Sequence, residues 1–368
     1  MSLLRRGGVV RCGRVSVRRN TPLSPPVDGP PVIPFGLVGW VVVAIVSTGV
    51  IWVGSDRLER AAAKLSRYYG LPVAVHGAVV VAVGSSFPEL SSVVISTLLH
   101  GEFSLGVGAI VGSAIFNLLV IPAASALASE ELEATRDVVH KDAQFYIISV
   151  LVLFITFALG ATYVPGGTNE AAILTPTLAL LPLLTYGVYV FLQYQDTRDH
   201  AAKPADGVDP RREWGLLAVA LVLIAVGVEG VVSAALAFGD AFDTPPFLWG
   251  LTVIAAATSL PDTIVSVRAA ADDDDVTSLT NVLGSNTFNL LVAIPVGVIL
   301  AGSATIDFLV AIPMMGFLAF ATLVFIVATR THLELTNLEA YALLGLYGVF
   351  LLWMVLETAG VVDGVQGI

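Results

Sequence analysis

Two short polar segments lie within long apolar stretches of the chain, and each ends in a carboxylate. Residues 84–89 read Gly-Ser-Ser-Phe-Pro-Glu, and residues 257–262 read Ala-Thr-Ser-Leu-Pro-Asp. Glu89 and Asp262 therefore fall well inside apolar segments, where an ionised carboxylate costs roughly 2.5–3.5 kcal/mol on insertion scales. No basic side chain is available at that depth to neutralise them. A bound cation is the natural counter-charge.

The residues around the two carboxylates supply further oxygen atoms. Pro88 and Pro261 each remove an amide donor and disrupt the helix one turn earlier, which frees backbone carbonyls there. Such carbonyls are costly when they face lipid but useful when they face an ion. An all-oxygen set suits hard cations such as Ca²⁺ and Na⁺ better than zinc or copper. The candidate oxygens are the carbonyls near Ala82, Ser85, Ala255 and Thr258, the hydroxyls of Ser85, Ser86, Thr258 and Ser259, and the amides of Asn117 and Asn289.

A second pair of motifs follows the first at a similar distance. Residues 112–117 read Gly-Ser-Ala-Ile-Phe-Asn and residues 284–289 read Gly-Ser-Asn-Thr-Phe-Asn, an offset of 172 positions. The first pair is offset by 173 positions, and the same offset carries Gly54 onto Gly227. Two polar motifs that recur in the same order and at the same distance indicate an internal repeat.

The composition requires a membrane protein. Of the 368 residues, 56% are hydrophobic and 13% are charged, and the mean hydropathy is +0.86, whereas soluble domains carry about 25% charged residues. One membrane-spanning helix needs about 20 apolar residues, so the chain has room for roughly ten. The net charge of −11 excludes a nucleic-acid partner. The single cysteine, Cys12, excludes an internal disulfide framework and a thiolate zinc site.

The apolar segments predict an all-α integral membrane protein with about ten transmembrane helices. Helices are expected near 35–55, 71–98, 104–128, 143–163, 172–194, 214–237, 246–270, 277–302, 307–329 and 338–357. Five spans separate the two copies of the motif pair, and an odd number reverses the second copy in the membrane. The sequence therefore predicts two five-helix repeats of inverted topology, a design that places the transport site at the repeat interface near the midplane.

The predicted domain boundaries follow from this layout. Residues 34–195 form the first repeat, with its motifs on the spans 71–98 and 104–128, and residues 214–368 form the second, with its motifs on 246–270 and 277–302. Residues 196–213 are a short cytoplasmic connection. Residues 1–33 are rich in arginine and proline and are expected to be a disordered tail.

The basic residues predict the orientation of the spans. When the connections are numbered alternately, one set holds every lysine and arginine outside the tail and the other set holds none. The positive-inside bias then places the first set in the cytoplasm of a multi-pass cell-membrane protein, with both termini outside. The six arginines of the tail contradict this rule. The consistent set is Arg57, Arg60, Lys64, Arg67, Arg136, Lys141, Arg198, Lys203, Arg211, Arg212, Arg268 and Arg330.

At these motifs the chain resembles the calcium/cation antiporter superfamily, and within it the sodium/calcium exchanger type. The first repeat is similar to that of potassium-dependent sodium/calcium exchangers, and the second, at 258–263 and 284–289, is more similar to that of potassium-independent ones. The resemblance implies that Glu89 and Asp262 are central ligands shared by calcium and sodium. It also implies flanking oxygens from Ser85, Ser86, Thr258, Ser259 and the carbonyls of Ala82 and Ala255, with Ser113, Asn117, Ser285 and Asn289 lining the facing helices.

The expected function is exchange of Na⁺ for Ca²⁺ by alternating access. Ca²⁺ takes 6–8 oxygens, two or three Na⁺ ions could fill overlapping oxygens, and mutual exclusion of the two loads is the basis of exchange. If three Na⁺ replace one Ca²⁺, each cycle moves a net charge. We expect no enzymatic activity, no cofactor and no protein partner; the partners are Ca²⁺, Na⁺ and the lipid bilayer. Asn289, where potassium-dependent relatives have an aspartate, argues against K⁺ co-transport.

Three other functions remain open at this point. Ca²⁺/H⁺ exchange on the same scaffold requires that Glu89 and Asp262 titrate. An intramembrane serine hydrolase using Ser85 or Ser86 requires a histidine base within reach. A passive cation channel is distinguished from a carrier only by the repeat symmetry.

The remaining polar residues are given structural interpretations. Asp56 and Glu229, related by the 173-residue offset, are expected at span ends as boundary or packing charges. The run 272–275, four aspartates, is expected to be a solvated cytoplasmic turn. His76 is expected to be an interfacial histidine.

Overall fold

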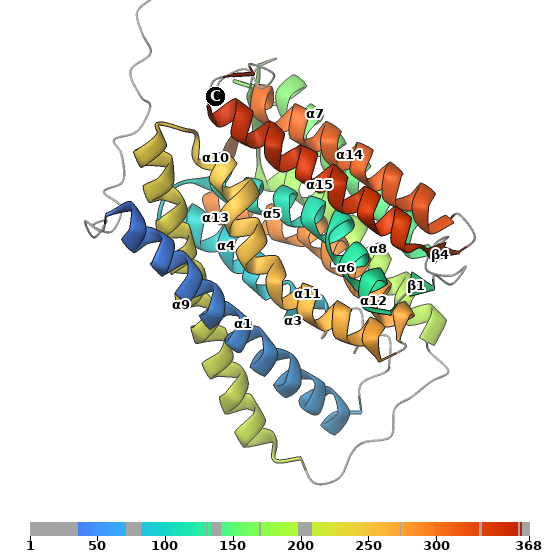
Figure 1. Ribbon diagram of the computed structural model, residues 1–368. Coiled ribbons are helices and arrows are strands. Elements are labelled where there is room, and N and C mark those ends of the chain that lie inside the picture. Colours follow the sequence, from blue (N-terminus) through green and yellow to red (C-terminus); the bar gives the residue numbers. More distant parts are fainter. Residues whose placement is uncertain are drawn as a thin grey trace, which may run out of the picture.

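The computed structural model describes residues 36–70, 82–129, 132–133, 141–168, 171–197, 208–272, 274–330, 333–359 and 361–362. Within these ranges nine helices are long and apolar enough to cross a membrane, and a shorter apolar helix, α4 (Phe87–Leu98), lies in the predicted second span. The predicted all-α membrane fold is therefore confirmed (Figure 1). The tail 1–33, the start of the second span and His76 lie outside the described residues.

The helices follow one another in two sets. The first set is α1 (Leu37–Tyr68), α3 (Ala82–Ser85), α4, α5 (Phe103–Leu119), α6 (Ile121–Ser129), α7 (Ala143–Thr162) and α8 (Pro176–Thr197). The second set is α9 (Pro210–Phe242), α10 (Pro246–Trp249), a π-helical segment Gly250–Ile254, α11 (Ala255–Ala271), α12 (Asp275–Phe288), a π-helical segment Asn289–Ala293, α13 (Ile294–Ala301), α14 (Phe308–Arg330) and α15 (Asn337–Thr358).

Two small antiparallel sheets join the two sets outside the helices. Strand β1 (Leu132–Glu133) pairs with β4 (Glu334–Leu335). Strand β2 (Ala171–Leu174) pairs with β3 (Ala304–Asp307), so that the connection before α8 is hydrogen-bonded to the connection before α14.

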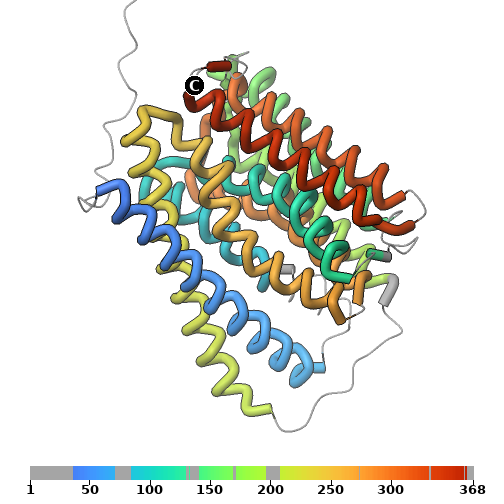
Figure 2. The backbone as a smooth tube through the Cα atoms, viewed as in Figure 1, coloured from blue at the N-terminus to red at the C-terminus, as the bar shows by residue number. Residues whose placement is uncertain are grey.

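Helices α1 and α9 form a long antiparallel pair along one side of the bundle, drawn blue and yellow-green in Figure 2. A methyl group added at Gly54 would lie 2.7 Å from Ile224, and one added at Gly227 would lie 2.8 Å from Ile51. The 173-residue offset turns the first of these contacts into the second. The two helices therefore cross about a local two-fold axis, which is what inverted repeats require, and small residues allow their backbones to approach closely.

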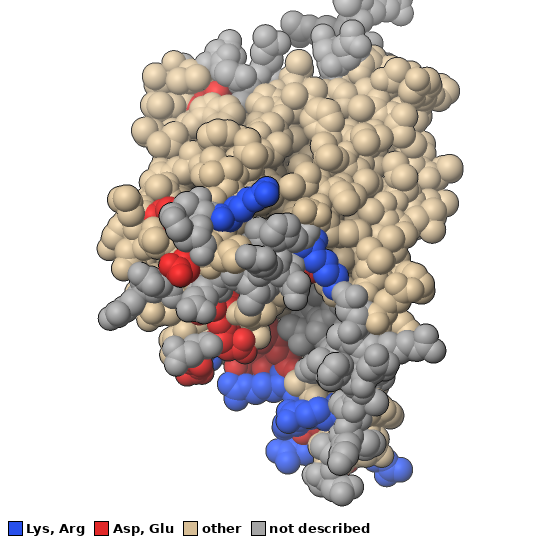
Figure 3. Space-filling view, turned by 90° about the vertical axis from the view of Figure 1, so that its right-hand side faces the viewer, with Lys and Arg blue, Asp and Glu red and all other residues tan. Residues whose placement is uncertain are grey.

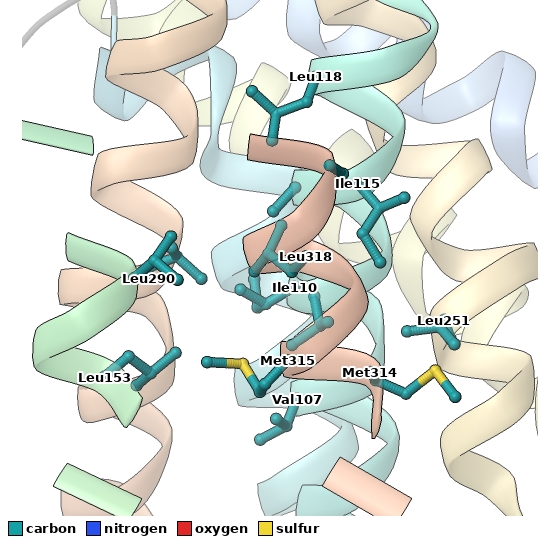
Figure 4. Packing of buried hydrophobic residues seen from close by; sticks show 14 of the residues in the cluster. Val107, Ile110, Ile115, Leu118, Leu153, Leu251, Leu290, Met314, Met315 and Leu318 are labelled. Atoms are coloured by element: carbon teal, nitrogen blue, oxygen red, sulfur yellow. The ribbon is translucent and has the colours of Figure 1, made fainter. Parts of the chain in front are cut away.

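The spans that carry the motifs lie at the centre of the bundle. Of the most apolar window in each span, 83% is buried for Phe103–Ser129 and for Asp275–Ala301, but only 17% for Leu37–Tyr68. In Figure 4, Val107, Ile110 and Ile115 of α5 pack against Met314, Met315 and Leu318 of α14. The exposed flanks of α1, α8, α9 and α15 carry large apolar side chains, as a lipid-facing surface requires.

Two helices extend further than predicted. Helix α1 continues past residue 55 to Tyr68, because Leu58, Ala61 and Leu65 keep a buried face and Arg60 pairs with Asp56 one turn earlier at 2.6 Å. Helix α9 begins at Pro210, where the Asp209 side chain accepts a hydrogen bond from the Arg211 amide. The prediction that Asp56 and Glu229 lie at span ends was therefore wrong, since both lie inside long helices.

The α1–α9 contact leads to a test of the repeat axis. Gly54→Val would push a side chain into Ile224, and overpacking of this kind costs about 1–3 kcal/mol. Gly49→Val, on the same helix, meets nothing within 4 Å. Thermal unfolding of the detergent-solubilised protein should show a lower Tm for Gly54→Val than for Gly49→Val. Equal melting temperatures would contradict a close-packed interface at Gly54.

Candidate cation-binding site

Four helices meet at the two carboxylates. Glu89 is in the first turn of α4 and Asp262 is in the middle of α11, and both have 0% exposure. Helix α5 packs against both α4 and α11, and α12 packs against α11. The structure therefore brings the two symmetry-related motif pairs, far apart in the sequence, to one buried place.

The two proline motifs differ in their backbone. Helix α3 ends at Ser85, Ser86 leaves the helix, and Pro88 lies in the first turn of α4, so the first motif contains a true break. In the second repeat, α11 runs without interruption through Pro261, and the irregular π-helical turn precedes it. The predicted interruption at both prolines is therefore found in the first repeat only. The Ala255 carbonyl is not left free, because it accepts a weak hydrogen bond of 3.4 Å from the Thr258 hydroxyl.

A chain of hydroxyls leads to each carboxylate. Ser113 Oγ donates to Glu89 Oε1 at 3.3 Å and lies 2.8 Å from Ser259 Oγ. The serine hydroxyl has only one proton. Since Ser113 donates it to the carboxylate, Ser259 must donate to Ser113. The direction of the chain is Ser259 to Ser113 to Glu89.

The same chain exists in the other half. Ser285 Oγ donates to Asp262 Oδ2 at 2.8 Å and lies 2.8 Å from Ser86 Oγ, which must therefore donate to it. The repeat offsets of 172 and 173 carry one chain onto the other, residue by residue. In both chains the outer serine belongs to one repeat and the carboxylate to the other, so the hydrogen bonds join the two repeats at the site.

The hydroxyl residues three positions before each proline also interact with the carboxylate of the opposite repeat. Ser85 of the first repeat interacts with Asp262, and Thr258 of the second repeat interacts with Glu89. Both are buried, as are all the hydroxyl-bearing candidates. The fold therefore brings together the predicted hydroxyls of Ser85, Ser86, Ser113, Thr258, Ser259 and Ser285; the side chain of Ala82 is outside the described part of the chain.

Several oxygens at this place have no donor among the described residues. Glu89 Oε2, Asp262 Oδ1, Asn117 Oδ1 and Asn289 Oδ1 are buried and make no hydrogen bond. A buried acceptor left without a partner costs about 1–3 kcal/mol, and more when it is charged. Asn117 and Asn289 follow by four residues Ser113 and Ser285, the serines that donate to the two carboxylates, so these oxygens are candidate ligands for a hard cation. No group of three His, Cys, Asp or Glu residues that could hold a metal ion occurs in the described ranges.

Two residues that contact the candidate site were missed by the sequence analysis. Asn286 accepts a hydrogen bond from Asn117 Nδ2 at 3.0 Å and donates to the Ala114 carbonyl at 3.2 Å, so it fixes the orientation of the Asn117 amide. It is the third residue of the second Gly-Ser-x-x-Phe-Asn motif, and the first repeat has Ala114 there, which is the available signal. Glu59, which interacts electrostatically with Asp262, was missed because α1 was expected to end at residue 55.

The histidine that the serine hydrolase hypothesis needs is not found beside the serines in the described residues. His100 Nε2 lies 3.0 Å from Glu229 Oε2, and Ser86 is engaged by Ser285. Glu229 also accepts a hydrogen bond from Ser233. Glu229 thus has a structural partner, in agreement with a packing charge, although its position in the helix was predicted wrongly.

Comparison with known proteins gives a family match over most of the chain. The family model described as sodium/calcium exchanger protein matches residues 39–195 and 212–356. The inner membrane protein YrbG of Escherichia coli K12 is 28% identical over 261 residues, which are 68% of this chain and 77% of YrbG. The matched ranges stop at the connection between the two helix sets, as expected for a two-repeat family.

Two solved structures share the fold. A sodium-calcium exchanger, NCX_Mj, soaked with 2.5 mM Na⁺ and 1 mM Sr²⁺, aligns over 87% of this chain and 98% of its own with a TM-score of 0.59 and 20% identity. An H⁺/Ca²⁺ exchanger, CAX, aligns over 85% of this chain and 82% of its own with a TM-score of 0.67 and 17% identity. At these identities the likeness concerns the fold.

The hydroxyl chains lead to a test of the site. Ser285→Ala removes the donor to Asp262 and a candidate cation oxygen, so the rise in Tm caused by added Ca²⁺ should shrink. Ser125→Ala is the matched control, because it breaks an equally buried Ser278–Ser125 hydrogen bond about two turns away along α12. The control should lower the Tm without Ca²⁺ yet keep the Ca²⁺-dependent rise. A full Ca²⁺ response in Ser285→Ala would contradict the assignment.

Proposed function

The chain belongs to the sodium/calcium exchanger protein family, and on that premise we propose that it exchanges Na⁺ for Ca²⁺ across the membrane by alternating access. The observation that carries the proposal is the set of buried, unpartnered oxygens on Glu89, Asp262, Asn117 and Asn289, framed by two symmetric hydroxyl chains. Those candidate ligands come from both repeats, so one ion would be held between the halves.

The charge of the site supports a divalent load. The two carboxylates carry two negative charges when ionised, and one Ca²⁺ neutralises them with no other basic group. Carboxylate, hydroxyl and amide oxygens together approach the 6–8 ligands that Ca²⁺ requires. Two or three Na⁺ ions would occupy overlapping oxygens, so either load excludes the other. Exchange of three Na⁺ for one Ca²⁺ would move one charge per cycle, about 2.3 kcal/mol per 100 mV of membrane potential.

The packing of α1 and α9 supports alternating access. These two helices contact each other along their length and face lipid on their outer sides, whereas α5 and α12 are enclosed. A peripheral pair that meets the centre through one face can slide or rock without unpacking the four central helices. The pair would then open the site first to one side of the membrane and then to the other.

The charged side chains support one orientation. On the face shown in Figure 3, most of the lysine and arginine atoms gather toward the lower part of the view, and the remainder is largely uncharged. The basic residues of α1, Arg57, Arg60, Lys64 and Arg67, lie in its second half. By the positive-inside bias, this end faces the cytoplasm and the termini face outward in a cell membrane.

The direct test is transport in vesicles. Proteoliposomes loaded with Na⁺ should accumulate labelled Ca²⁺ against its gradient, and collapse of the Na⁺ gradient should stop the uptake. Uptake that ignores Na⁺ and follows an imposed pH gradient would instead assign the two carboxylates to proton exchange. Flux in both directions without coupling to either gradient would indicate a channel.

The proposed site predicts that Glu89 and Asp262 are both required for Ca²⁺ uptake. Glu89→Gln and Asp262→Asn each leave the divalent ion with one charge unbalanced, so either substitution should abolish Na⁺-dependent Ca²⁺ uptake. Glu357→Gln is the control, because Glu357 is a buried carboxyl in α15 that accepts a hydrogen bond from Trp353 at 2.7 Å. It should transport like the wild type. Normal uptake by either site variant, at equal amounts in the membrane, would show that the site is misassigned.

A further inference from the structure

Helix α1 carries a polar stripe on the face that turns toward the site. Ser55, Glu59 and Ser66 follow one another at helical spacing, beside the separate face on which Gly54 and Leu58 pack against α9. Ser55 has 0% exposure and its hydroxyl makes no hydrogen bond to any described residue; the same holds for the buried Oε1 of Glu59. Two oxygens one turn apart on one helix face therefore have no hydrogen-bond partner among the described residues, although buried polar atoms normally have one.

The stripe lies next to the first proline motif. A methyl group added at Gly84 would lie 3.9 Å from Glu59 Cγ and would meet nothing else within 4 Å. Gly84 directly precedes Ser85, which interacts with Asp262, and Glu59 itself interacts electrostatically with Asp262. Helix α1 packs against both α3 and α11. Glu59 therefore stands at the edge of the site, between it and the arginine-rich end of α1.

Among the described residues, the neighbours of Glu59 do not balance its charge. The charged groups that act on it are Asp262, Asp56 and Arg60, in decreasing order, and the two strongest of these repel it. Arg60 is engaged by Asp56 at 2.6 Å, and Lys64 by Glu213 at 3.0 Å. A partly buried carboxylate among like charges is unfavourable unless it is paired or neutralised, and a cation is one partner that would compensate it.

The second repeat lacks this stripe. The 173-residue offset places Val228 and Val232 of α9 where the first repeat has Ser55 and Glu59, and both valines have 0% exposure. The polar stripe next to the site therefore exists on α1, and the matching positions of α9 are apolar.

We propose that Ser55 and Glu59 line a one-sided approach to the site, where Glu59 attracts cations from the arginine-rich end of the bundle and passes them to Asp262. Glu59 is a positioning residue, distinct from the central ligands. Because Coulomb attraction doubles for a divalent ion, the approach favours Ca²⁺ over Na⁺ at that face. A negative group at the mouth of a low-dielectric path raises the local cation concentration and the association rate. The inference rests on the proposed function, since it assumes that cations reach Glu89 and Asp262.

The test compares the two faces of the membrane. Na⁺-dependent Ca²⁺ uptake is measured in everted and in right-side-out membrane vesicles from cells that express the full chain. Glu59→Gln should raise the Ca²⁺ concentration for half-maximal uptake by about three- to tenfold in everted vesicles, where the arginine-rich end faces the medium, and should leave right-side-out vesicles unchanged. Ser55→Ala should cause a smaller change on the same side, and Glu59→Asp should restore wild-type behaviour.

The matched control is Asp56→Asn, which removes the same charge from the same helix but from a side chain that pairs with Arg60 on an exposed face. Screening by solvent should hold its effect below about twofold in either vesicle type. A Glu59→Gln effect equal to that of Asp56→Asn, or equal on both faces, would overturn the proposal. If Glu59→Gln does not reach the membrane, the same two criteria apply to Ser55→Ala. Failure of the wild type to couple Ca²⁺ to Na⁺ would instead overturn the proposed function.

Discussion

Two fully buried carboxylates that have no basic partner among the described residues are the constraint on which the rest of this structure depends. Glu89 and Asp262 each have one oxygen that accepts a serine hydroxyl and one that accepts no hydrogen bond from the described residues. An arginine in place of those donors would have neutralised the charge permanently. Hydroxyls instead stabilise the charge partially and leave it available to an ion that can leave again. The preference for weak neutral donors over a salt bridge is what suits the site to a transported load.

The crossed hydroxyl chains explain why both halves of the chain are needed. Each carboxylate takes its direct donor from its own repeat, but the serine behind that donor comes from the other repeat. Neither half could satisfy its own hydroxyls alone. The contacts between α1 and α9 cross between the repeats in the same way, because Gly54 faces Ile224 of the second repeat and Gly227 faces Ile51 of the first. The two-fold relation therefore holds both at the candidate site and at the peripheral α1–α9 pair.

The sequence predicted the parts of this arrangement that depend on local pattern. Apolar runs located the spans, and two symmetric proline motifs located the carboxylates, because both signals lie within a few residues. What it could not predict depends on tertiary contacts. The extension of α1 to Tyr68 depends on a buried face that packs against α9. Because this helix was expected to end at residue 55, Glu59 was not identified as a helical residue near the site. The contacts of Asn286 likewise depend on Asn117 and Ala114 of the other repeat.

The two repeats differ at positions next to the candidate site, and these differences distinguish its two sides. Gly84 leaves room for Glu59, whereas its mate Ala257 contributes a methyl group to the apolar cluster that contains Val228 and Val232. Such a difference cannot bias the net direction of exchange, because ion gradients alone set it. A group at one mouth changes the rates of arrival and departure at that face, and so shifts the concentration range over which the face responds. Under the proposed exchange, one side could therefore respond to a lower Ca²⁺ concentration while the proposed ligands Glu89 and Asp262 stay the same.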